Sequence, residues 1–203
     1  MNVKHIHING ASGTGKSTYA KEKIIKKADE KGKKVLIIDP EDEYTDFKEI
    51  KDIKNLKELF KKHNIVRYIP DITKDKESLL KEIDDIYRFI FHYCRNLVIL
   101  VDEAPAVGAD LHKPAPHLKA LLTRGRKRGL QVILISQRIS QINKDLSGNC
   151  RIKIFFKCAE EIDWDRYKQI NREAYEFLKN VEHPHAYVII EDGKIKKTFP
   201  KVD

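Results

Sequence analysis

The sequence contains no apolar run long enough to cross a membrane. Even clean apolar stretches, such as residues 97–101 and 132–135, fall far short of the roughly 18–20 residues that a spanning helix needs. The first residues show no apolar core followed by a cleavage site, so we expect no secretory signal.

Cysteine is also scarce, with three among 203 residues, and no two of them form a Cys-x-x-Cys pair. This argues against a disulfide framework or a zinc site and favours a reducing, cytoplasmic setting. The eight histidines include two close pairs, His5 with His7 and His183 with His185. Neither pair has a third ligand at metal-site spacing, so we expect packing or surface roles.

Acidic residues are absent from one long segment. Residues 111–144 contain no Asp or Glu but eight Lys or Arg, a formal charge of +8 against +9 for the whole chain. Such a concentration favours a polyanionic partner such as nucleic acid. The apolar content of 41% argues against disorder and supports one domain with its own core over residues 1–203.

Short apolar, β-branched runs alternate with segments of helical periodicity. The expected strands are residues 6–8, 35–39, 66–70, 97–102, 131–136, 152–157 and 187–191. This alternation predicts an α/β fold with a mainly parallel central sheet flanked by helices. Residues 187–191 and 194–199 flank Asp192-Gly193, which predicts a C-terminal β-hairpin. We expect the core at about residues 3–158, followed by a helix and the hairpin over 159–203.

A phosphate-binding loop follows the first expected strand. Residues 10–17, Gly-Ala-Ser-Gly-Thr-Gly-Lys-Ser, complete the G-x4-G-K-[ST] pattern between a strand and a helix. Its backbone N–H groups would converge on phosphate oxygens, Lys16 would add charge at the β- and γ-phosphates, and Ser17 would offer a hydroxyl to Mg²⁺. The candidate ATP-binding residues are Gly10, Ser12, Gly13, Thr14, Gly15, Lys16, Ser17 and Thr18.

Two carboxylates end the expected strand at 97–102. The carboxyl ends of strands are where open α/β sheets bind ligands. Asp102 would therefore hold Mg²⁺, and Glu103 would orient or deprotonate the water that attacks the γ-phosphate. A glutamate in this place favours hydrolysis over transfer to a bound acceptor. The competing interpretation is a solvent-exposed acidic turn.

The basic segment carries two further candidates. Arg124, Arg126 and Arg128 lie at an expected helix end, where they would contact nucleic-acid phosphates, reach a neighbouring subunit's γ-phosphate, or simply be solvated beside the helix dipole. Gln137 follows the strand at 131–136. It would hydrogen-bond the attacking water or the γ-phosphate, unless it is only a structural amide.

Four segments together resemble one family. They are residues 10–17, residues 38–44 (Ile-Asp-Pro-Glu-Asp-Glu-Tyr), residues 101–104 (Val-Asp-Glu-Ala), and residues 124–127 (Arg-Gly-Arg-Lys) leading to Ser-Gln-Arg at 136–138. With these segments, the sequence resembles the HerA/FtsK superfamily of P-loop ATPases that pump DNA, and the likeness covers roughly residues 3–158, about three quarters of the chain. The likeness is greatest to the minimal versions with which viruses package genomes.

The resemblance implies a RecA-like core, a ring of subunits (often a hexamer) and ATP-driven movement of double-stranded DNA. By position, Gln137 matches the polar sensor, and Arg126 best matches the basic residue before that strand, the candidate trans-acting finger. Glu43 matches an acidic residue whose role we cannot derive: from the strand end it would approach the nucleotide site, unless it caps a helix or lies on the surface. The irregular loop expected at 104–117 has no matching pattern, and it would line a pore or serve as a connector.

The leading interpretation is therefore an ATP-hydrolysing double-stranded DNA translocase, a genome-packaging motor subunit that uses ATP and Mg²⁺. Its expected partners are DNA and further copies of itself, and a viral capsid or portal component is compatible with this role. Its expected place is the host cytoplasm or the virion. Two alternatives stay open: a nucleoside-type phosphotransferase and a slow nucleotide-dependent assembly switch.

Overall fold

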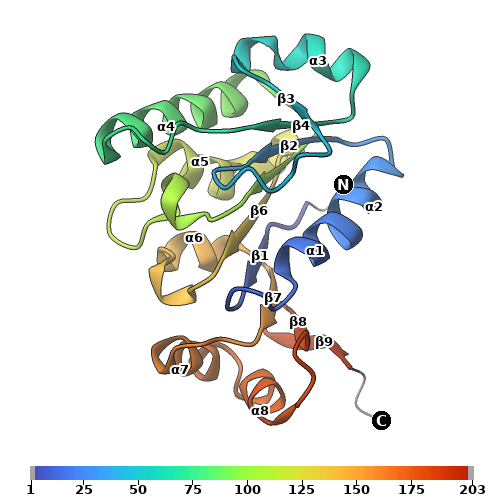
Figure 1. Cartoon of the computed structure of the whole chain (residues 1–203), viewed down its shortest axis with the longest axis vertical. Helices are drawn as coiled ribbons and strands as arrows, with labels where there is room; N and C mark the ends of the chain where they lie inside the picture. The colour runs from blue at the N-terminus through green and yellow to red at the C-terminus, as the bar shows by residue number, and fades with distance from the viewer. Residues whose placement is uncertain (1–2, 201–203) are drawn as a thin grey trace.

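A computed structural model describes residues 3–200 and has one nine-stranded sheet at its centre (Figure 1). The strands are β1 (Ile6–Asn9), β2 (Lys34–Ile38), β3 (Lys48–Glu49), β4 (Ile65–Tyr68), β5 (Leu97–Val101), β6 (Gln131–Ser136), β7 (Ile152–Phe156), β8 (Tyr187–Glu191) and β9 (Lys194–Phe199). Their order across the sheet is β3-β4-β2-β5-β6-β1-β7-β8-β9. The pairs from β3 to β7 are parallel, and β8 and β9 are antiparallel to their neighbours. The predicted fold class is confirmed.

Helices cover both faces of the sheet because neighbouring strand residues point to opposite sides. The helices are α1 (Lys16–Tyr19), which continues through Ala20–Ile25 into α2 (Lys26–Asp29), then α3 (Leu56–Lys62), α4 (Lys76–Tyr93), α5 (Pro116–Arg124), α6 (Lys144–Asn149), α7 (Glu161–Ile170) and α8 (Arg172–Asn180). In β2, Val35 and Ile37 pack with the α1–α2 helix, whereas Leu36 and Ile38 pack in the core beneath α4 and α5. Both faces of the central strands are therefore buried.

Helix α4 shows how the sequence sets one of these layers. Asp75 caps its first turn by accepting hydrogen bonds from the backbone N–H groups of Glu77 and Ser78. Its apolar residues recur at helical spacing and are buried against the sheet: Leu79, Ile83, Ile86, Tyr87 and Ile90. The helix therefore lies along the sheet with one apolar face inward.

The C-terminal part follows the prediction in outline. Strands β8 and β9 form the expected hairpin, with Asp192 (φ 52°) and Gly193 (φ 79°) in the left-handed region that such a turn requires. The single helix expected after residue 158 is two helices, because Asn171 is extended (φ −158°) and caps α8 by accepting from the N–H of Ala174. These helices pack on β7 and β8 through Phe155, Val188 and other buried residues.

Two further departures concern short segments. The edge strand β3 was not expected, since its two residues show no apolar run. The loop at 104–117 is partly ordered as a helical turn over Pro105–Ala109, which is interrupted at Gly108 (φ 106°). The hydroxyl of Tyr87 donates to the carbonyl of Val107 (2.7 Å) and fixes this turn to α4.

A buried polar network joins β1 to its surroundings. Asn9 donates to the Ser136 hydroxyl at the end of β6 (2.7 Å), and the Tyr167 hydroxyl of α7 donates to the side-chain oxygen of Asn9 (2.6 Å). The ring nitrogens of His7 lie 3.1 Å from the Ser136 hydroxyl and 3.0 Å from that of Ser147. Burial lowers the pKa of His7 to about 3, so the ring is neutral. The network ties the strand before the phosphate loop to β6, α6 and α7.

We expect Tyr167→Phe to lower the free energy of unfolding by about 1–3 kcal/mol, because Asn9 loses a buried donor while the ring volume is kept. Urea unfolding of the two proteins measures the difference. Tyr93→Phe is the matched control: Tyr93 is 76% exposed, and its loss of a hydroxyl should change stability by less than about 0.5 kcal/mol. Equal effects of the two substitutions would show that the network contributes nothing.

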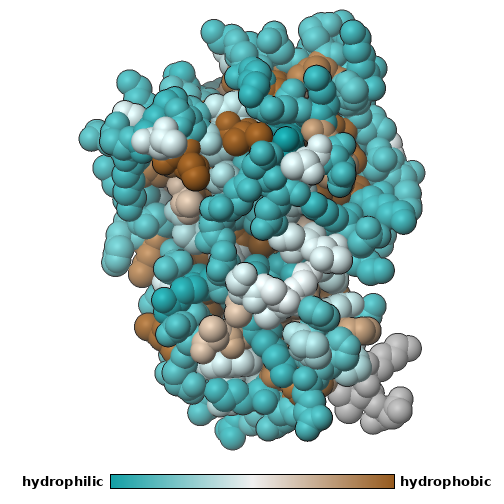
Figure 2. All heavy atoms as spheres, in the orientation of Figure 1, coloured by the Kyte–Doolittle hydropathy of each residue, from teal (hydrophilic) through white to brown (hydrophobic). Residues whose placement is uncertain are grey.

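The surface is mainly hydrophilic on the face drawn in Figure 2, with apolar residues in small separate groups. Within residues 3–200, none of the helices has the length and apolar character that crossing a membrane requires.

Candidate nucleotide site

The loop between β1 and α1 lies at the carboxyl edge of the sheet. Gly10 is extended and passes so close to β7 that a Cβ there would lie 2.5 Å from the Cβ of Phe156. Ala11 then donates its N–H to the carbonyl of Lys157 (2.8 Å). Gly15, at the start of α1, has φ 98°, which a residue with a Cβ rarely adopts. The chain thus turns directly from the central strand β1 into the helix.

Lys16 and Ser17 form the first turn of that helix. Lys16 is buried, and its Nζ donates to the carbonyl of Ala11 across the loop (2.8 Å). Burial lowers the pKa of this ammonium group, while the carboxylates of Asp102 and Glu103 oppose that shift. A polyphosphate in the loop would give the buried ammonium group a direct anionic partner.

The predicted acidic pair follows β5 at the same edge. The Asp102 carboxylate accepts the backbone N–H of Glu103 (2.8 Å), and Glu103 itself has φ 37°, so the chain turns sharply where the strand ends. Burial raises the pKa of both carboxyl groups. Because β5 is separated from β1 only by β6, the two loops face each other across one strand.

Gln137 completes this arrangement from the end of β6. Its amide Nε2 donates to Oε2 of Glu103 (3.1 Å). The residues on either side are anchored. Ser136 belongs to the buried network, and Arg138 donates to the buried carboxylate of Asp163 on α7 (3.2 Å). The amide is therefore held against Glu103 by a strand end that has little freedom.

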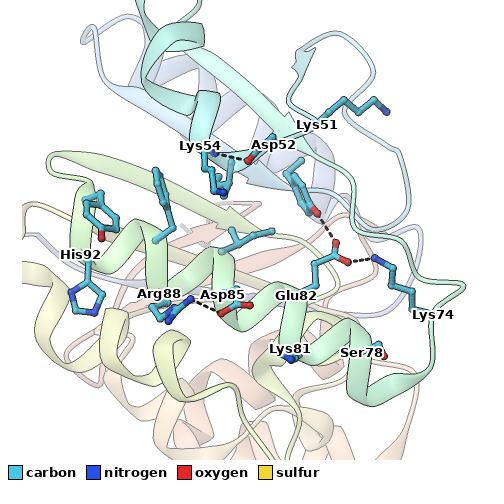
Figure 3. Close-up of a pocket in the computed structure, with 15 residues that line it drawn as sticks. Lys51, Asp52, Lys54, Lys74, Ser78, Lys81, Glu82, Asp85, Arg88 and His92 are labelled. Atoms are coloured by element: carbon cyan, nitrogen blue, oxygen red, sulfur yellow. Dashed lines mark hydrogen bonds and ion pairs between the residues drawn. The ribbon is translucent and has the colours of Figure 1, made fainter.

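These groups enclose a cavity of about 250 Å³. Its lining comprises Ser12, Gly13, Gly15, Lys16, Ser17, Thr18, Glu41, Glu43, Asp102, Glu103, Gln137 and His185. Of the predicted phosphate-loop residues, only Gly10 and Thr14 lie behind this lining. The hydroxyl of Thr14 donates a hydrogen bond to the carbonyl of Ala11 within the loop (2.8 Å). A larger hollow of about 980 Å³ lies along α4 beside β4 (Figure 3), and several of its charged groups are paired with one another, as in Lys74–Glu82 and Arg88–Asp85.

The residues present fit a magnesium ion. Asp102 is buried, and within residues 3–200 its side chain has one hydrogen bond of good geometry, the one from Glu103. The hydroxyl of Tyr44 is buried beside this carboxylate, which raises its pKa, and among the described residues it has no hydrogen-bond partner of good geometry. The Asp102 carboxylate therefore keeps acceptor capacity beyond its bond from Glu103, which suits a hydrated cation between Asp102 and Ser17.

Arg126 is not part of this cavity. It lies in the 3-10 turn Gly125–Arg128 before β6. Burial and, to a lesser extent, the nearby charge of Arg126 lower the pKa of His5, the residue before β1, to about 4. His5 and the start of β6 both lie at the amino edge of the sheet, opposite the edge that carries the phosphate loop. Arg126, Arg124 and Lys127 line a surface hollow there with Val3. Arg126 therefore cannot serve the nucleotide site of its own chain.

Some of the other basic residues of the segment 111–144 make contacts within the chain. Arg128 lies in the 3-10 turn that follows α5. It bonds to the carbonyl of Phe91, and its guanidinium carbon lies 4.4 Å from the centre of the Phe91 ring. Lys119 pairs with Asp145 (3.1 Å).

Two features of the site go beyond the prediction. His185 reaches the phosphate loop from the segment before β8, although the sequence predicted only packing or surface roles for this residue. In the segment after β2, the Asp39 carboxylate accepts the N–H groups of Glu43 and Tyr44 (2.9 and 3.0 Å). This capping turn directs Glu43 toward the cavity and Tyr44 into the core. The Asp-Pro-x-x-Glu-Tyr pattern is the feature of the sequence from which this turn could have been predicted.

A phosphate loop after a central strand of a mainly parallel sheet, facing an acidic pair on the next strand but one, defines a P-loop NTPase. The family model "Helicase HerA, central domain" matches residues 1–98. Protein P9 of Pseudoalteromonas phage PM2 is 29% identical over 198 residues, which cover 95% of this chain and 87% of that protein.

Solved structures agree in fold. The genome packaging NTPase B204 of Sulfolobus turreted icosahedral virus 2, in complex with AMPPCP, superposes with a TM-score of 0.81 at 18% identity, covering 99% of this chain and 100% of that one. B204 of Sulfolobus turreted icosahedral virus, a DNA-packaging ATPase, gives 0.76 at 21% identity over the whole of both chains. The predicted resemblance to HerA is confirmed by the family model over residues 1–98, and the fold agrees with that of the packaging NTPase B204.

Proposed function

We propose that this protein hydrolyses ATP and uses the cycle to move double-stranded DNA, as one subunit of a ring that packages a viral genome. The observation that carries the proposal is the contact between Glu103 and Gln137 over a phosphate loop (3.1 Å). A base for water and a sensor amide are thereby within reach of one γ-phosphate. The matched virus proteins, which are named as packaging NTPases, support the biological setting.

Nucleotide binding would rest on the phosphate loop. Its N–H groups and the buried Lys16 would hold the β- and γ-phosphates. Ser17 and Asp102 would hold Mg²⁺, which supplies charge compensation for the triphosphate. Lys16 would then exchange the carbonyl of Ala11 for phosphate oxygens, a stronger, charge-assisted contact.

Hydrolysis would depend on Glu103. Its Oε2 accepts from Gln137, which leaves Oε1 to take a proton from the water that attacks the γ-phosphate. Burial raises the pKa of this carboxyl group toward neutral pH, and a carboxylate with a higher pKa is a better base. Gln137 would keep the carboxylate oriented and respond when the γ-phosphate leaves.

The ring would complete the site. Arg126 lies at the amino edge of the sheet, away from its own phosphate loop, and so is free to reach the site of an adjacent subunit. The remaining exposed cations of residues 111–144 would contact DNA phosphates, a role that needs many charges and little geometric precision. Both roles suit the concentration of basic residues in that segment.

The test is steady-state ATP hydrolysis with and without double-stranded DNA over a salt series. We expect DNA to stimulate turnover and the stimulation to fade as salt rises, because released counterions drive the association. Equal, slow turnover under all conditions would favour the assembly switch. A requirement for a nucleoside, with a phosphorylated nucleoside as product, would instead identify a phosphotransferase.

A further inference from the structure

His185 lies against the phosphate loop on the side away from Glu103. A Cβ placed on Gly15 would be 3.5 Å from Nδ1 of His185 and 3.9 Å from its Cβ. The imidazole is exposed and forms part of the cavity lining together with Thr18. No step of the proposed hydrolysis uses it.

The sheet order explains why this histidine reaches the site. Strand β8 is antiparallel to β7, with Tyr187 paired to Phe156, so β8 begins at the carboxyl edge where β7 ends. The segment before β8 is thereby delivered to the edge that carries the phosphate loop. A parallel strand in this place would begin at the other edge of the sheet.

The same order sets the direction of a bound nucleotide. Strands β5 and β6, which carry Glu103 and Gln137, lie on one side of β1, and β7 and β8 lie on the other. With the γ-phosphate beside Glu103, as proposed above, the nucleoside would extend toward β8, past Thr18 and His185.

Aromatic rings gather on that side. His185 lies beside His183 (ring centroids 6.0 Å apart), and His183 lies edge-on to Phe199 (5.1 Å). Phe199, which is 40% exposed, is stacked on Tyr187 (5.4 Å). His183, His185 and Phe199, here called the aromatic rim, form a partly exposed group of rings, of which His185 lines the cavity. Flat rings of this kind suit the π-face of a purine.

We infer that the aromatic rim receives the adenine of bound ATP, with His185 making the contact closest to the phosphate loop. This inference rests on the proposed ATP site and names what holds the other end of the same ligand. The phosphate loop would provide most of the binding energy, and the aromatic rim would distinguish a nucleotide from a bare polyphosphate.

The experiment compares two ligands, MgATP and magnesium tripolyphosphate, by calorimetric titration of the full chain. We expect His185→Ala to weaken ATP binding about tenfold, the scale of one base–aromatic stack, and to leave tripolyphosphate affinity within about twofold. His185→Phe should keep most of the ATP affinity because a flat ring remains. Phe199→Ala should weaken ATP binding in the same ligand-selective way.

Two controls separate the possible failures. Lys16→Ala should lose affinity for both ligands, and Tyr93→Ala, which removes a 76% exposed ring on α4, should lose neither. If wild-type protein binds no ATP, the proposed function itself fails. If it binds ATP but His185→Ala does so equally well, or loses both ligands equally, the inference about the aromatic rim is overturned. Loss of ATP affinity in His185→Phe equal to that in His185→Ala also contradicts it.

Discussion

Replacement of Glu103 by glutamine is expected to lower the rate of ATP hydrolysis by about 10²–10⁴-fold while ATP still binds. The amide keeps the size of the side chain and can still bond to Gln137, but it cannot accept the proton of the attacking water. Single-turnover hydrolysis and equilibrium ATP binding, measured on the same preparation, separate the two effects.

The matched control is Glu30→Gln, an exposed glutamate at the end of α2 that lies outside the cavity lining. Its turnover should equal that of the wild type. Unchanged turnover in Glu103→Gln would remove this residue from the mechanism. Loss of ATP binding would instead mean that the carboxylate holds the ligand rather than activating water.

Replacement of Arg126 by alanine is expected to lower hydrolysis by about 10³–10⁵-fold, the usual contribution of an arginine finger. Because Arg126 lies at the sheet edge opposite its own phosphate loop, this loss should arise at the neighbouring subunit's site. Arg88→Ala is the control, since Arg88 is exposed on α4 and pairs only with Asp85 among the described residues. That variant should hydrolyse ATP normally.

Mixing two inactive variants tests the action between subunits. An Arg126→Ala subunit keeps Glu103, and a Glu103→Gln subunit keeps Arg126. In a mixed ring, a Glu103→Gln subunit can therefore supply Arg126 to the site of an adjacent Arg126→Ala subunit, and that site has both residues. We expect mixing to restore hydrolysis that neither variant has alone. The absence of any recovery, together with a strictly proportional loss when Arg126→Ala is mixed with wild type, would contradict action across an interface.

The parts of the site that the sequence predicted are local in the chain. The phosphate loop is one continuous segment, and Asp102 and Glu103 directly follow an apolar strand, so motif and strand pattern together place them at one edge. The ends of the strands differ from expectation by one or two residues. The hairpin was predictable for the same reason, because its Asp-Gly turn lies between two runs of alternating residues.

What the sequence did not predict depends on non-local pairing. His185 reaches the phosphate loop only because β8 is antiparallel to β7, and no pattern near residue 185 encodes that choice. Asn9 and Tyr167 are 158 residues apart in the chain, yet they share a buried hydrogen bond. Arg128 resembled its basic neighbours in sequence, but the tertiary fold places it on the Phe91 ring.

The account depends on one geometric claim, that the phosphate loop and the end of β5 bind a single Mg²⁺–triphosphate between them. A crystal structure with a nonhydrolysable ATP analogue and Mg²⁺ tests it most directly. We expect Lys16 on the β- and γ-phosphates, Ser17 and Asp102 around the ion, and Glu103 facing the terminal phosphate. An analogue bound elsewhere at saturation, or a triphosphate in the loop with Asp102 turned away from its metal, would contradict the claim.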